Sequence, residues 1–430
     1  MKLLNLQSKN LDSTLATVRR ERRKSPGVEK TVRDILARVR RYGDGALFDL
    51  TRKFDGARLS SLSVTKKEIA EAYQVESRQV IAALKDAKKN IEKFHSKTLI
   101  RKEAVVETIK GVQLWREFRP IEKVGLYIPG GQAAYPSTVL MLGVPAKIAG
   151  CKEIILCVPA EPSGKVPSAV LVAADLCGIS KIYKVGGAQA IAAMAYGTKT
   201  IPKVSKIFGP GNQYVTTAKQ LVFGEVDIDM PAGPTEVLVL ADDSAKADWI
   251  AADLLSQLEH GRDSQAILVT LQKALAIRVM AGMKSQIPYL SRKEIITESL
   301  KKSFAVVADS LKTAIAFVNE YAPEHLEIVL RNKEKEALAR TANAGSVFLG
   351  PFASEPLGDY ATGANHTLPT SGYAKVFSAL SVESFGKKIQ VQRVTKQGIT
   401  ALRKTVEVLA EREGLTAHKN AVSIRFKKTI

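Results

Sequence analysis

Histidine is scarce in this 430-residue chain, and four of its five histidines lie in polar motifs that also carry Gln, Asp or Glu side chains. Imidazole binds transition metals and exchanges protons near neutral pH, so this pairing is typical of a metal site or an acid–base site. His95 lies instead in a basic run, where an ordinary surface or packing role is expected. The motifs join Gln257 with His260, Glu324 with His325, Asp359 with His366, and Glu413 with His418.

The first motif ends a helix predicted at 245–260. Gln257 and His260 are three residues apart, so on a helix they share one face, with Cβ atoms about 5–6 Å apart. That geometry suits two ligands of one metal ion, although an amide is an uncommon ligand. The alternative is a histidine that only interacts with the helix dipole before Gly261.

The second motif, Glu324 and His325, follows Pro323, where a helix could begin. The free N–H groups of a first helical turn disfavour the imidazolium form, so we expect His325 to be neutral and able to accept a proton. A carboxylate beside such a histidine indicates an acid–base pair. A helix-capping arrangement is the alternative.

The other two histidines lie in segments with turn-forming residues. Residues 356–366, which include Asp359 and His366, predict a long polar loop, and such loops usually bind something. Residues 413–418 close the last predicted helix. There the simplest interpretation of Gly414 is a C-cap, and His418 is an ordinary surface residue.

Alternating strands and helices must position these motifs. From about residue 123, short β-branched runs end in Gly or Pro turns and lead into Ala-rich helices, which predicts an α/β fold with a parallel sheet covered on both faces. The predicted strands are 124–128, 153–158, 181–185, 204–208, 236–240, 265–270, 304–307, 326–329 and 344–348. The predicted helices are 28–42, 66–94, 137–149, 167–177, 188–196, 212–223, 245–260 and 397–413, with a further helical region at 272–303.

Three Gly-rich loops follow predicted strands, at 127–131, 185–189 and 209–212. Ligands of parallel sheets bind beyond the carboxyl ends of the strands, and the N–H groups of a following helix can bind an anion. None of the loops matches GxGxxG, so each is as well explained by a tight structural turn.

Composition narrows the class of protein. The net charge of +21 raises nucleic acid or an anionic membrane as partners, but the charge is dispersed and its densest run, 19–24, lacks aromatic residues, so we expect neither. The three cysteines lie in apolar stretches, as buried thiols of a reducing compartment do. The longest uncharged stretch, 124–146, is interrupted by Pro and Gly, and the first residues lack a signal segment. These features predict a cytoplasmic protein.

Together the motifs resemble the histidinol dehydrogenase family over essentially the whole chain. The matching segments are 127–131, 135–139, 186–191, 209–212, 232–238, 255–261, 322–326, 358–363 and 414–418. The resemblance implies NAD-dependent oxidation of L-histidinol to L-histidine through L-histidinaldehyde, the last steps of histidine biosynthesis, in an enzyme that binds Zn²⁺.

The resemblance also implies two Rossmann-like parallel-sheet domains with small helical extensions at both termini. The expected parts are an N-terminal helical extension, 1–25; a zinc and substrate domain, 26–122 plus 236–380; an NAD domain, 123–235; and a C-terminal arm, 381–430. The resemblance further implies a homodimer, in which the C-terminal arm of each subunit crosses to the partner subunit and completes the partner's site.

Residue roles implied by the resemblance follow the matching positions. Glu324 and His325 would be the catalytic acid–base pair. The zinc ligands would be Gln257, His260, Asp359 and His418. NAD would contact Tyr127, Gln189 and Asn212. The substrate would contact Thr235, Gln257, His260, His325, Asp359, His366, Glu413 and His418.

Three positions depart from the family pattern: Thr235 stands where Ser is usual, Leu142 where Asn is expected, and Pro231 in a stretch that is usually apolar. These departures put substrate fit in doubt more than the type of reaction.

In the implied mechanism, His325 accepts the hydroxyl proton, Glu324 activates water to hydrate the aldehyde, and zinc positions the substrate. A zinc-dependent hydrolase with Glu324 as base and an inactive nucleic-acid-binding protein are the alternatives.

Overall fold

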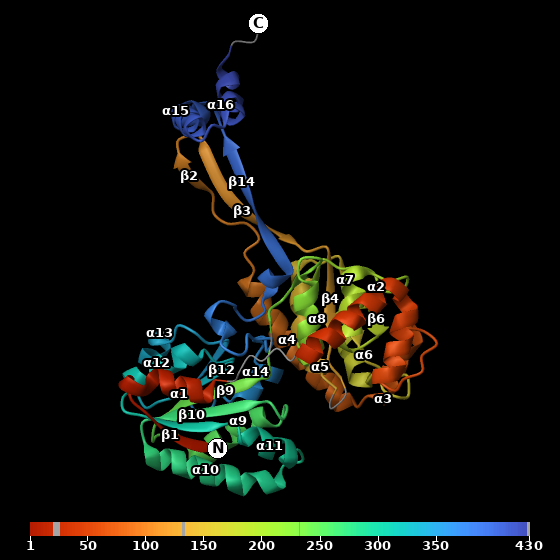
Figure 1. Cartoon of the computed structure of the whole chain (residues 1–430), viewed down its shortest axis with the longest axis vertical. Helices are drawn as coiled ribbons and strands as arrows, with labels where there is room; N and C mark the ends of the chain where they lie inside the picture. Colours follow the sequence, from red (N-terminus) through yellow and green to blue (C-terminus); the bar gives the residue numbers. More distant parts are fainter. Residues whose placement is uncertain (20–25, 131–133, 232, 428–430) are drawn as a thin grey trace. The chain divides into compact units, whose positions relative to one another are not determined.

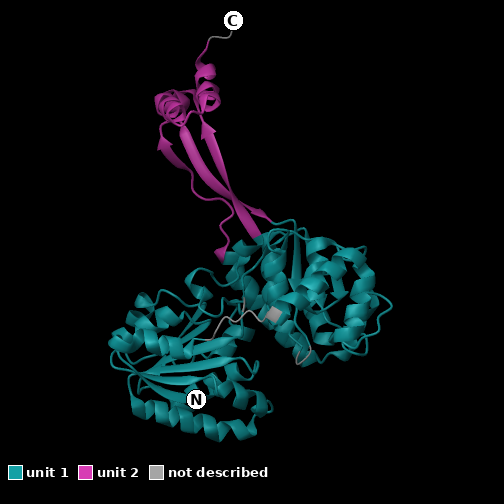
Figure 2. Ribbon diagram, viewed as in Figure 1, with its two compact units in different colours: residues 1–97, 121–385 teal, residues 98–120, 386–430 magenta. Residues whose placement is uncertain are grey.

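The computed structural model of the chain describes residues 1–19, 26–130, 134–231 and 233–427. The chain divides into two compact units, which Figure 2 colours separately. Unit 1 comprises Met1–Lys97 and Ile121–Phe385, and unit 2 comprises Thr98–Pro120 and Gly386–Ile430. Unit 1 contains two parallel sheets, which we call sheet A and sheet B.

Sheet A consists of parallel strands in the order β1-β11-β10-β9-β12-β13 (Figure 1). Successive side chains of its strands alternate between two apolar clusters, one shared with α1 and α12 and the other with α9 and α10. Burial on both faces explains why the strands are continuous apolar runs. The strands are β1 (Lys2–Leu6), β9 (Glu236–Ala241), β10 (Gln265–Thr270), β11 (Phe304–Ala308), β12 (His325–Val329) and β13 (Ser346–Leu349). The helices of this region are α1 (Leu11–Val18), α9 (Ala247–Leu258), α10 (Lys273–Gln286), α11 (Lys293–Leu300), α12 (Leu311–Tyr321), α13 (Glu334–Arg340) and α14 (Glu355–Tyr360).

Sheet B has the parallel order β6-β5-β4-β7-β8. This order repeats that of β9 to β13: the first strand is central, the next two add on one side, and the last two add on the other, as in Rossmann-like folds. The strands are β4 (Lys123–Tyr127), β5 (Glu153–Val158), β6 (Lys181–Lys184), β7 (Lys206–Phe208) and β8 (Asp227–Ile228). The helices are α2 (Pro26–Phe54), α3 (Lys66–Val75), α4 (Arg78–Thr98), α5 (Pro136–Ala149), α6 (Ser168–Leu176), α7 (Gly187–Tyr196) and α8 (Gln213–Val222).

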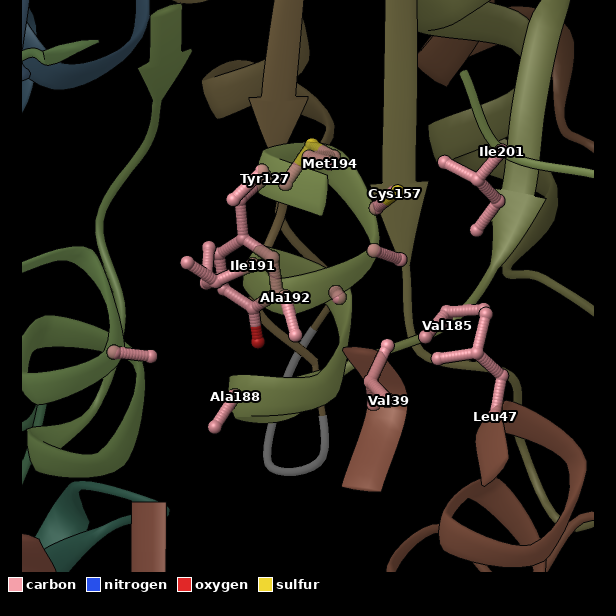
Figure 3. Close-up of a cluster of buried hydrophobic side chains, with 14 of the residues drawn as sticks. Val39, Leu47, Tyr127, Cys157, Val185, Ala188, Ile191, Ala192, Met194 and Ile201 are labelled. Atoms are coloured by element: carbon pink, nitrogen blue, oxygen red, sulfur yellow. The ribbon is translucent and has the colours of Figure 1, made fainter. Parts of the chain in front are cut away.

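Helix α2 packs on the sheet B side of unit 1. Its buried residues recur at helical spacing, as in Val32, Ile35 and Val39, and they join one cluster with side chains of α7, α8 and sheet B. Figure 3 shows Val39 and Leu47 of α2 in this cluster. The predicted boundaries instead group 26–122 with the sheet A residues 236–380. The structure instead places α2 with sheet B, because the apolar face of α2 packs on the Ala-rich surface of α7. Amphipathic spacing predicts that a helix has an apolar face but not which sheet that face packs on.

Unit 2 is built on sheet C, in which β3 pairs antiparallel with both β14 and β2. Its elements are β2 (Val106–Ile109), β3 (Val112–Pro120), β14 (Gly386–Val394), α15 (Lys396–Arg412) and α16 (Thr416–Ser423). The β3–β14 pairing runs from Gly386 opposite Pro120 to Val394 opposite Val112. Residues 98–120 therefore belong with the C-terminal segment, a long-range pairing that the predicted arm 381–430 does not include.

The predicted α/β fold with parallel sheets is confirmed, and each predicted strand is present with ends within about two residues, the usual uncertainty of element boundaries. Several local predictions are wrong. The single helix expected at 66–94 is divided into α3 and α4. The N-terminal segment, expected to be helical, begins with β1, which pairs with β11 because its apolar side chains complete the edge of sheet A. The segment expected to be a loop from residue 356 begins within α14, where Ser354 is the N-cap and Pro356 lies in the first turn, a position that suits proline.

Two expectations from composition concern the cysteines and the membrane. Cys151, Cys157 and Cys177 are buried and unpaired, as predicted. Burial raises the pKa of Cys151 and of Cys177 to about 12, so these thiols are unreactive. In the described part of the chain, no helix combines the length and apolar character needed to cross a bilayer.

Candidate active site

Chemically active side chains gather at the amino ends of two neighbouring strands of sheet A, β9 and β12. β9 begins at Glu236 and β12 at His325, and these parallel neighbours place His325 opposite Val237. The helix predicted to begin at Pro323 is therefore wrong. The side chains of 326–329 are buried on both faces of the sheet, and this burial favours a strand over a helix that would expose one side.

Glu324 is buried and held by two donors. Its Oε2 accepts hydrogen bonds from the Thr235 hydroxyl at 2.5 Å and from the Glu236 N–H at 2.9 Å. The Thr235 hydroxyl oxygen accepts a further hydrogen bond from Nε2 of Gln257 at 2.7 Å. Burial raises the pKa of Glu324 to about 7, although His325 and the hydrogen bonds from the Thr235 hydroxyl and the Glu236 N–H act to lower it. Near neutral pH this carboxyl can therefore both accept and release a proton.

His325 is buried, and its two ring nitrogens have different surroundings. Nδ1 lies 3.1 Å from the carbonyl oxygen of Glu236, so it donates to that oxygen in the matching tautomer. Nε2 lies 3.7 Å from Oε1 of Glu355 and 3.7 Å from Oδ1 of Asp359. Burial lowers the pKa of His325, but the carboxylates of Glu324, Asp359 and Glu355 outweigh it and raise the pKa to about 10. Carboxylates and not the expected helix N–H groups face the ring, so without a bound cation they favour the imidazolium over the neutral form that was expected.

Helix α14 supplies two carboxylates to this place. Glu355 and Asp359 are four residues apart, so they lie on one face of the helix. Ligand atoms of His260, Glu355 and Asp359 all lie within 4.8 Å of one another. Burial, reinforced by Asp359, raises the pKa of Glu355 to about 8. For Asp359, burial is outweighed by the neighbouring histidines, chiefly His325, which lower its pKa to about 2.

Gln257 and His260 belong to the same region, but they do not share a helical face. α9 ends at Leu258, and the N–H of His260 donates to the carbonyl of Gln257 at 3.4 Å, so His260 lies in a turn beyond the helix. The predicted helical spacing of this pair is wrong because the chain turns toward Gly261 earlier than expected. Gln257 remains within the last turn of α9 and is buried.

The donor set fits a zinc ion. Oε1 of Gln257 and Oε1 of Glu355 are buried, and among the described residues neither atom has a hydrogen-bond partner. A buried polar atom without a hydrogen-bond partner is often the site of a bound ion or water molecule. A ring nitrogen of His260 lies within 4.8 Å of carboxylate oxygens of Glu355 and Asp359. An imidazole nitrogen with carboxylate and amide oxygens is a ligand set that Zn²⁺ accepts.

His366 lies beside this cluster. Its Nδ1 is 3.1 Å from the backbone carbonyl of Asp359 and 4.0 Å from its Oδ1, and its Nε2 is 3.3 Å from the Thr138 hydroxyl. Burial lowers the pKa of His366, which favours the neutral ring. The structure thus places five predicted residues around Glu324 and His325: Thr235, Gln257, His260, Asp359 and His366.

Glu413 and His418 belong to unit 2. Glu413 is the C-cap of α15 and His418 lies in α16, and both are exposed. They are not among the groups that unit 1 brings together.

A separate cavity of about 820 Å³ contains the three residues expected to contact NAD, Tyr127, Gln189 and Asn212. It lies beyond the carboxyl ends of β4 and β7 of sheet B and at the start of α7. This is the position where ligands of parallel sheets bind. The neighbouring residues 131–133, part of the first Gly-rich loop and its continuation, lie outside the described residues.

Backbone contacts shape the wall of this cavity. The N–H of Gly187 donates to the Tyr127 hydroxyl at 3.1 Å, and Asn212 caps α8 by accepting from the N–H of Tyr214 at 3.0 Å. Gly209 has a φ of +124°, and a Cβ there would lie 2.1 Å from the Tyr127 carbonyl oxygen. Only glycine permits this approach.

A buried ion pair holds the loop that contains Gly209. The ammonium of Lys219 donates to the Gly209 carbonyl at 2.9 Å and also contacts the carboxylate of Asp229. Asp229 in turn accepts from the N–H of Gly209 at 2.7 Å. Both polar groups of the Gly209 backbone are thereby fixed by charged partners.

Two residues of the site were not predicted from the sequence: Glu355, which joins the metal-type cluster, and Thr138, which contacts His366. The spacing of Glu355 and Asp359 could have identified the first, because residues four apart share a helical face, but the segment was expected to be a loop. Thr138 gives no such signal, since it meets His366 only through a contact 228 residues apart in sequence.

Comparisons with known proteins give one consistent family. A family model described as "Histidinol dehydrogenase" matches residues 18–426. A histidinol dehydrogenase of Bacteroides fragilis (strain YCH46) is 53% identical over 399 residues, 93% of each chain, and one of Bacteroides thetaiotaomicron is 50% identical over 428 residues, 99% of each chain. The crystal structure of histidinol dehydrogenase from Elizabethkingia anophelis matches with a TM-score of 0.95 and 47% identity, covering 99% of this chain and 98% of that one. These matches do not support the hydrolase alternative. The chain belongs to the histidinol dehydrogenase family of oxidoreductases.

Proposed function

We propose that the protein oxidises L-histidinol to L-histidine through L-histidinaldehyde, with NAD as the oxidant and zinc as the resident metal. The observation that carries this proposal is the meeting of an acid–base pair, Glu324 and His325, with the metal-type cluster of His260, Glu355 and Asp359. The relatives' names supply the substrate. The cavity with Tyr127, Gln189 and Asn212 provides a separate place for the dinucleotide.

Gln257, His260 and Asp359 would hold the metal from this chain, with His418 from a second copy. When bound, zinc supplies positive charge that neutralises the carboxylates near His325 and positions the substrate through its imidazole and amine. Glu355 lies close enough to join or support these ligands.

His325 is the base for the alcohol. With zinc balancing the charge of the carboxylates that raise its pKa, the ring would be neutral: Nδ1–H would donate to the Glu236 carbonyl, and Nε2 would accept the hydroxyl proton while a hydride leaves carbon for NAD. The low dielectric of the buried site strengthens the effect of each neighbouring charge on this transfer.

Glu324 serves the second oxidation. Its carboxylate accepts a proton from the water that adds to the aldehyde, and the hydrate then gives a hydride to a second NAD. Thr235, which donates to Glu324 and accepts from Gln257, orients both groups. The Thr235 hydroxyl would thus link the base Glu324 to the proposed zinc ligand Gln257. This role is additional to the substrate contact expected for Thr235.

The working form is proposed to be a cytoplasmic homodimer in which unit 2 of each subunit completes the partner's site with Glu413 and His418. Unit 2 exposes large apolar side chains that a partner would cover, including Val408, Leu409 and Ile424, each more than half exposed. Neither nucleic acid nor membrane is a proposed partner.

The test is a count of NADH formed per L-histidinol consumed, made on protein of known zinc content. We expect two NADH per substrate, loss of turnover after chelation, and recovery on adding zinc. One NADH per substrate, with the aldehyde released, would contradict the double oxidation. Consumption of substrate without NADH would contradict the use of NAD.

A further inference from the structure

The sheet B cavity has an acidic lining in a strongly basic chain. The chain carries 64 Lys and Arg against 43 Asp and Glu, yet among the described residues that line the cavity the charged ones are Asp55 and Glu161, with no Lys or Arg. Building on the proposed function, we propose that Asp55 selects NAD over NADP by accepting a hydrogen bond from the adenosine ribose and excluding a 2′-phosphate.

The fold holds Asp55 firmly at the cavity. It follows the last residue of α2, and its N–H donates to the Thr51 carbonyl at 2.9 Å, which continues the helical bonding by one residue. Gly56, with a φ of +68°, then turns the chain away. Because α2 is packed into the sheet B core, this carboxylate has a fixed position relative to the cavity walls.

One oxygen of Asp55 lacks a partner. Oδ2 is buried and makes no hydrogen bond among the described residues. Burial raises the pKa of Asp55 to about 6, so the group is ionised at and above neutral pH. A buried carboxylate oxygen in this state gains from a hydroxyl donor, and a ribose supplies such donors.

The adenosine half of the dinucleotide is the half that this cavity holds. None of the residues that line it belongs to the cluster around His325, where the hydride must leave the substrate. The nicotinamide therefore extends out of the cavity. Apolar lining residues, including Pro129, Pro159, Pro162 and Val170, suit the flat adenine, and the start of α7 at Gly187 offers N–H groups to the pyrophosphate.

Charge then decides between the two cofactors. Sites for NADP place an arginine near the 2′-phosphate, whereas sites for NAD place a carboxylate near the 2′-hydroxyl. A 2′-phosphate beside ionised Asp55 would bring like charges together in a partly buried place, which opposes binding.

The experiment measures the affinity of two probes that lack nicotinamide, ADP-ribose and 2′-phospho-ADP-ribose, by titration calorimetry on the zinc-loaded protein. We expect the intact protein to bind ADP-ribose about 100-fold more tightly than the 2′-phosphorylated probe, as expected for juxtaposed like charges. Asp55→Asn should reduce this ratio to about threefold, chiefly because the 2′-phosphorylated probe then binds more tightly. The ratio of kcat/KM for NAD and NADP should change in the same direction.

Two matched controls locate the effect. Asp49→Asn removes a carboxylate from the same helix that is paired with Arg38 and Arg52 on the surface, and it should leave the ratio unchanged. Glu161→Gln removes the other lining carboxylate and should change the ratio less than Asp55→Asn does. If thermal melting shows that Asp55→Asn is unfolded, Asp55→Ser provides the same comparison.

The outcomes separate the two proposals. An unchanged probe ratio in folded Asp55→Asn, or a larger change in Glu161→Gln, would overturn the role of Asp55 while NAD use stands. Failure of the intact protein to bind ADP-ribose or to form NADH would overturn the proposed function, and the role of Asp55 with it.

Discussion

Sheets A and B are wound in the same strand order, but their functional groups lie at opposite ends of the strands. In sheet B, Tyr127 ends β4, and the loop of Gly209 follows the carboxyl end of its neighbour β7. In sheet A, Glu236 and His325 begin the neighbouring strands β9 and β12. The same winding therefore supports a cavity at one end and a cluster of ionisable groups at the other.

The difference comes from how each carboxyl end is closed. At the end of β9, Asp242 accepts hydrogen bonds from the N–H of Arg331 at 2.8 Å and from the N–H of Ser244 at 3.0 Å, which ties the loops after β9 and β12 together. In sheet B, the loop after β7 turns at Gly209, and Asn212 at the end of this loop lines a cavity. Strand order offers a crevice at a switch point, but the side chains of the loops decide whether a ligand can use it.

The largest effect should come from removing the base of the sheet A cluster. We expect His325→Ala to slow alcohol oxidation about a thousandfold, within the range for loss of a general base. Zinc content and dinucleotide affinity should be unchanged, because His325 is proposed to hold neither. Asp242→Asn, at the closed end of the same sheet, is the control and should keep turnover. Normal turnover in His325→Ala would refute its role as the base.

Loss of Glu324 should affect one oxidation more than the other. In Glu324→Gln we expect aldehyde oxidation to slow about 100-fold and alcohol oxidation much less. Because the pKa of Glu324 is raised to about 7, its carboxylate form increases as pH rises through 7, and aldehyde oxidation should rise with it. Rates measured separately from alcohol and aldehyde across pH 5 to 9 test this. Equal slowing of both steps would contradict the division of labour.

Loss of the Asp359 carboxylate should lower turnover by weakening the binding of zinc. We expect Asp359→Asn to weaken zinc binding by roughly 10–100-fold, at least the loss seen when a supporting partner of a metal ligand is removed. Zinc titration against a competing chelator measures this affinity, and added zinc should restore part of the turnover. Asp253 offers a control on the neighbouring helix α9, where it bonds to Ser354 and lies outside the metal-type cluster. Unaltered zinc affinity in Asp359→Asn would remove this residue from the ligand set.

The smallest expected effect on turnover concerns the loop in sheet B. Lys219→Met leaves Asp229 buried and unpaired, which should lower the free energy of unfolding by about 3–5 kcal/mol. We expect the KM for NAD to rise about tenfold, as for the loss of one charged hydrogen bond, with kcat nearly constant. As a control, Lys206→Met breaks a more exposed pair with Asp227, between β7 and β8, and should cost less than about 1 kcal/mol. A fall in kcat with unchanged KM would show that the loop does not position NAD.

Local pattern identified most elements of unit 1. The β-branched runs and Ala-rich helices predicted the strands of both sheets except β1 and β8, because periodicity and turn residues are properties of neighbouring residues. The same reasoning failed at Pro323, where burial in sheet A favours a strand. It also failed for the segment beginning at 356, where Ser354 and Pro356 start a short helix.

The sequence by itself determined the α/β class, the motifs that resemble the family, and most of the residues that meet around His325. Only the tertiary structure decided that α2 packs on sheet B, that β3 pairs with β14, and that Glu355 joins His260 and Asp359. It also decided the proton affinities of Glu324 and His325. The physical reason is that packing partners, burial and electrostatic fields depend on residues far apart in the chain, whereas strand and helix patterns are local.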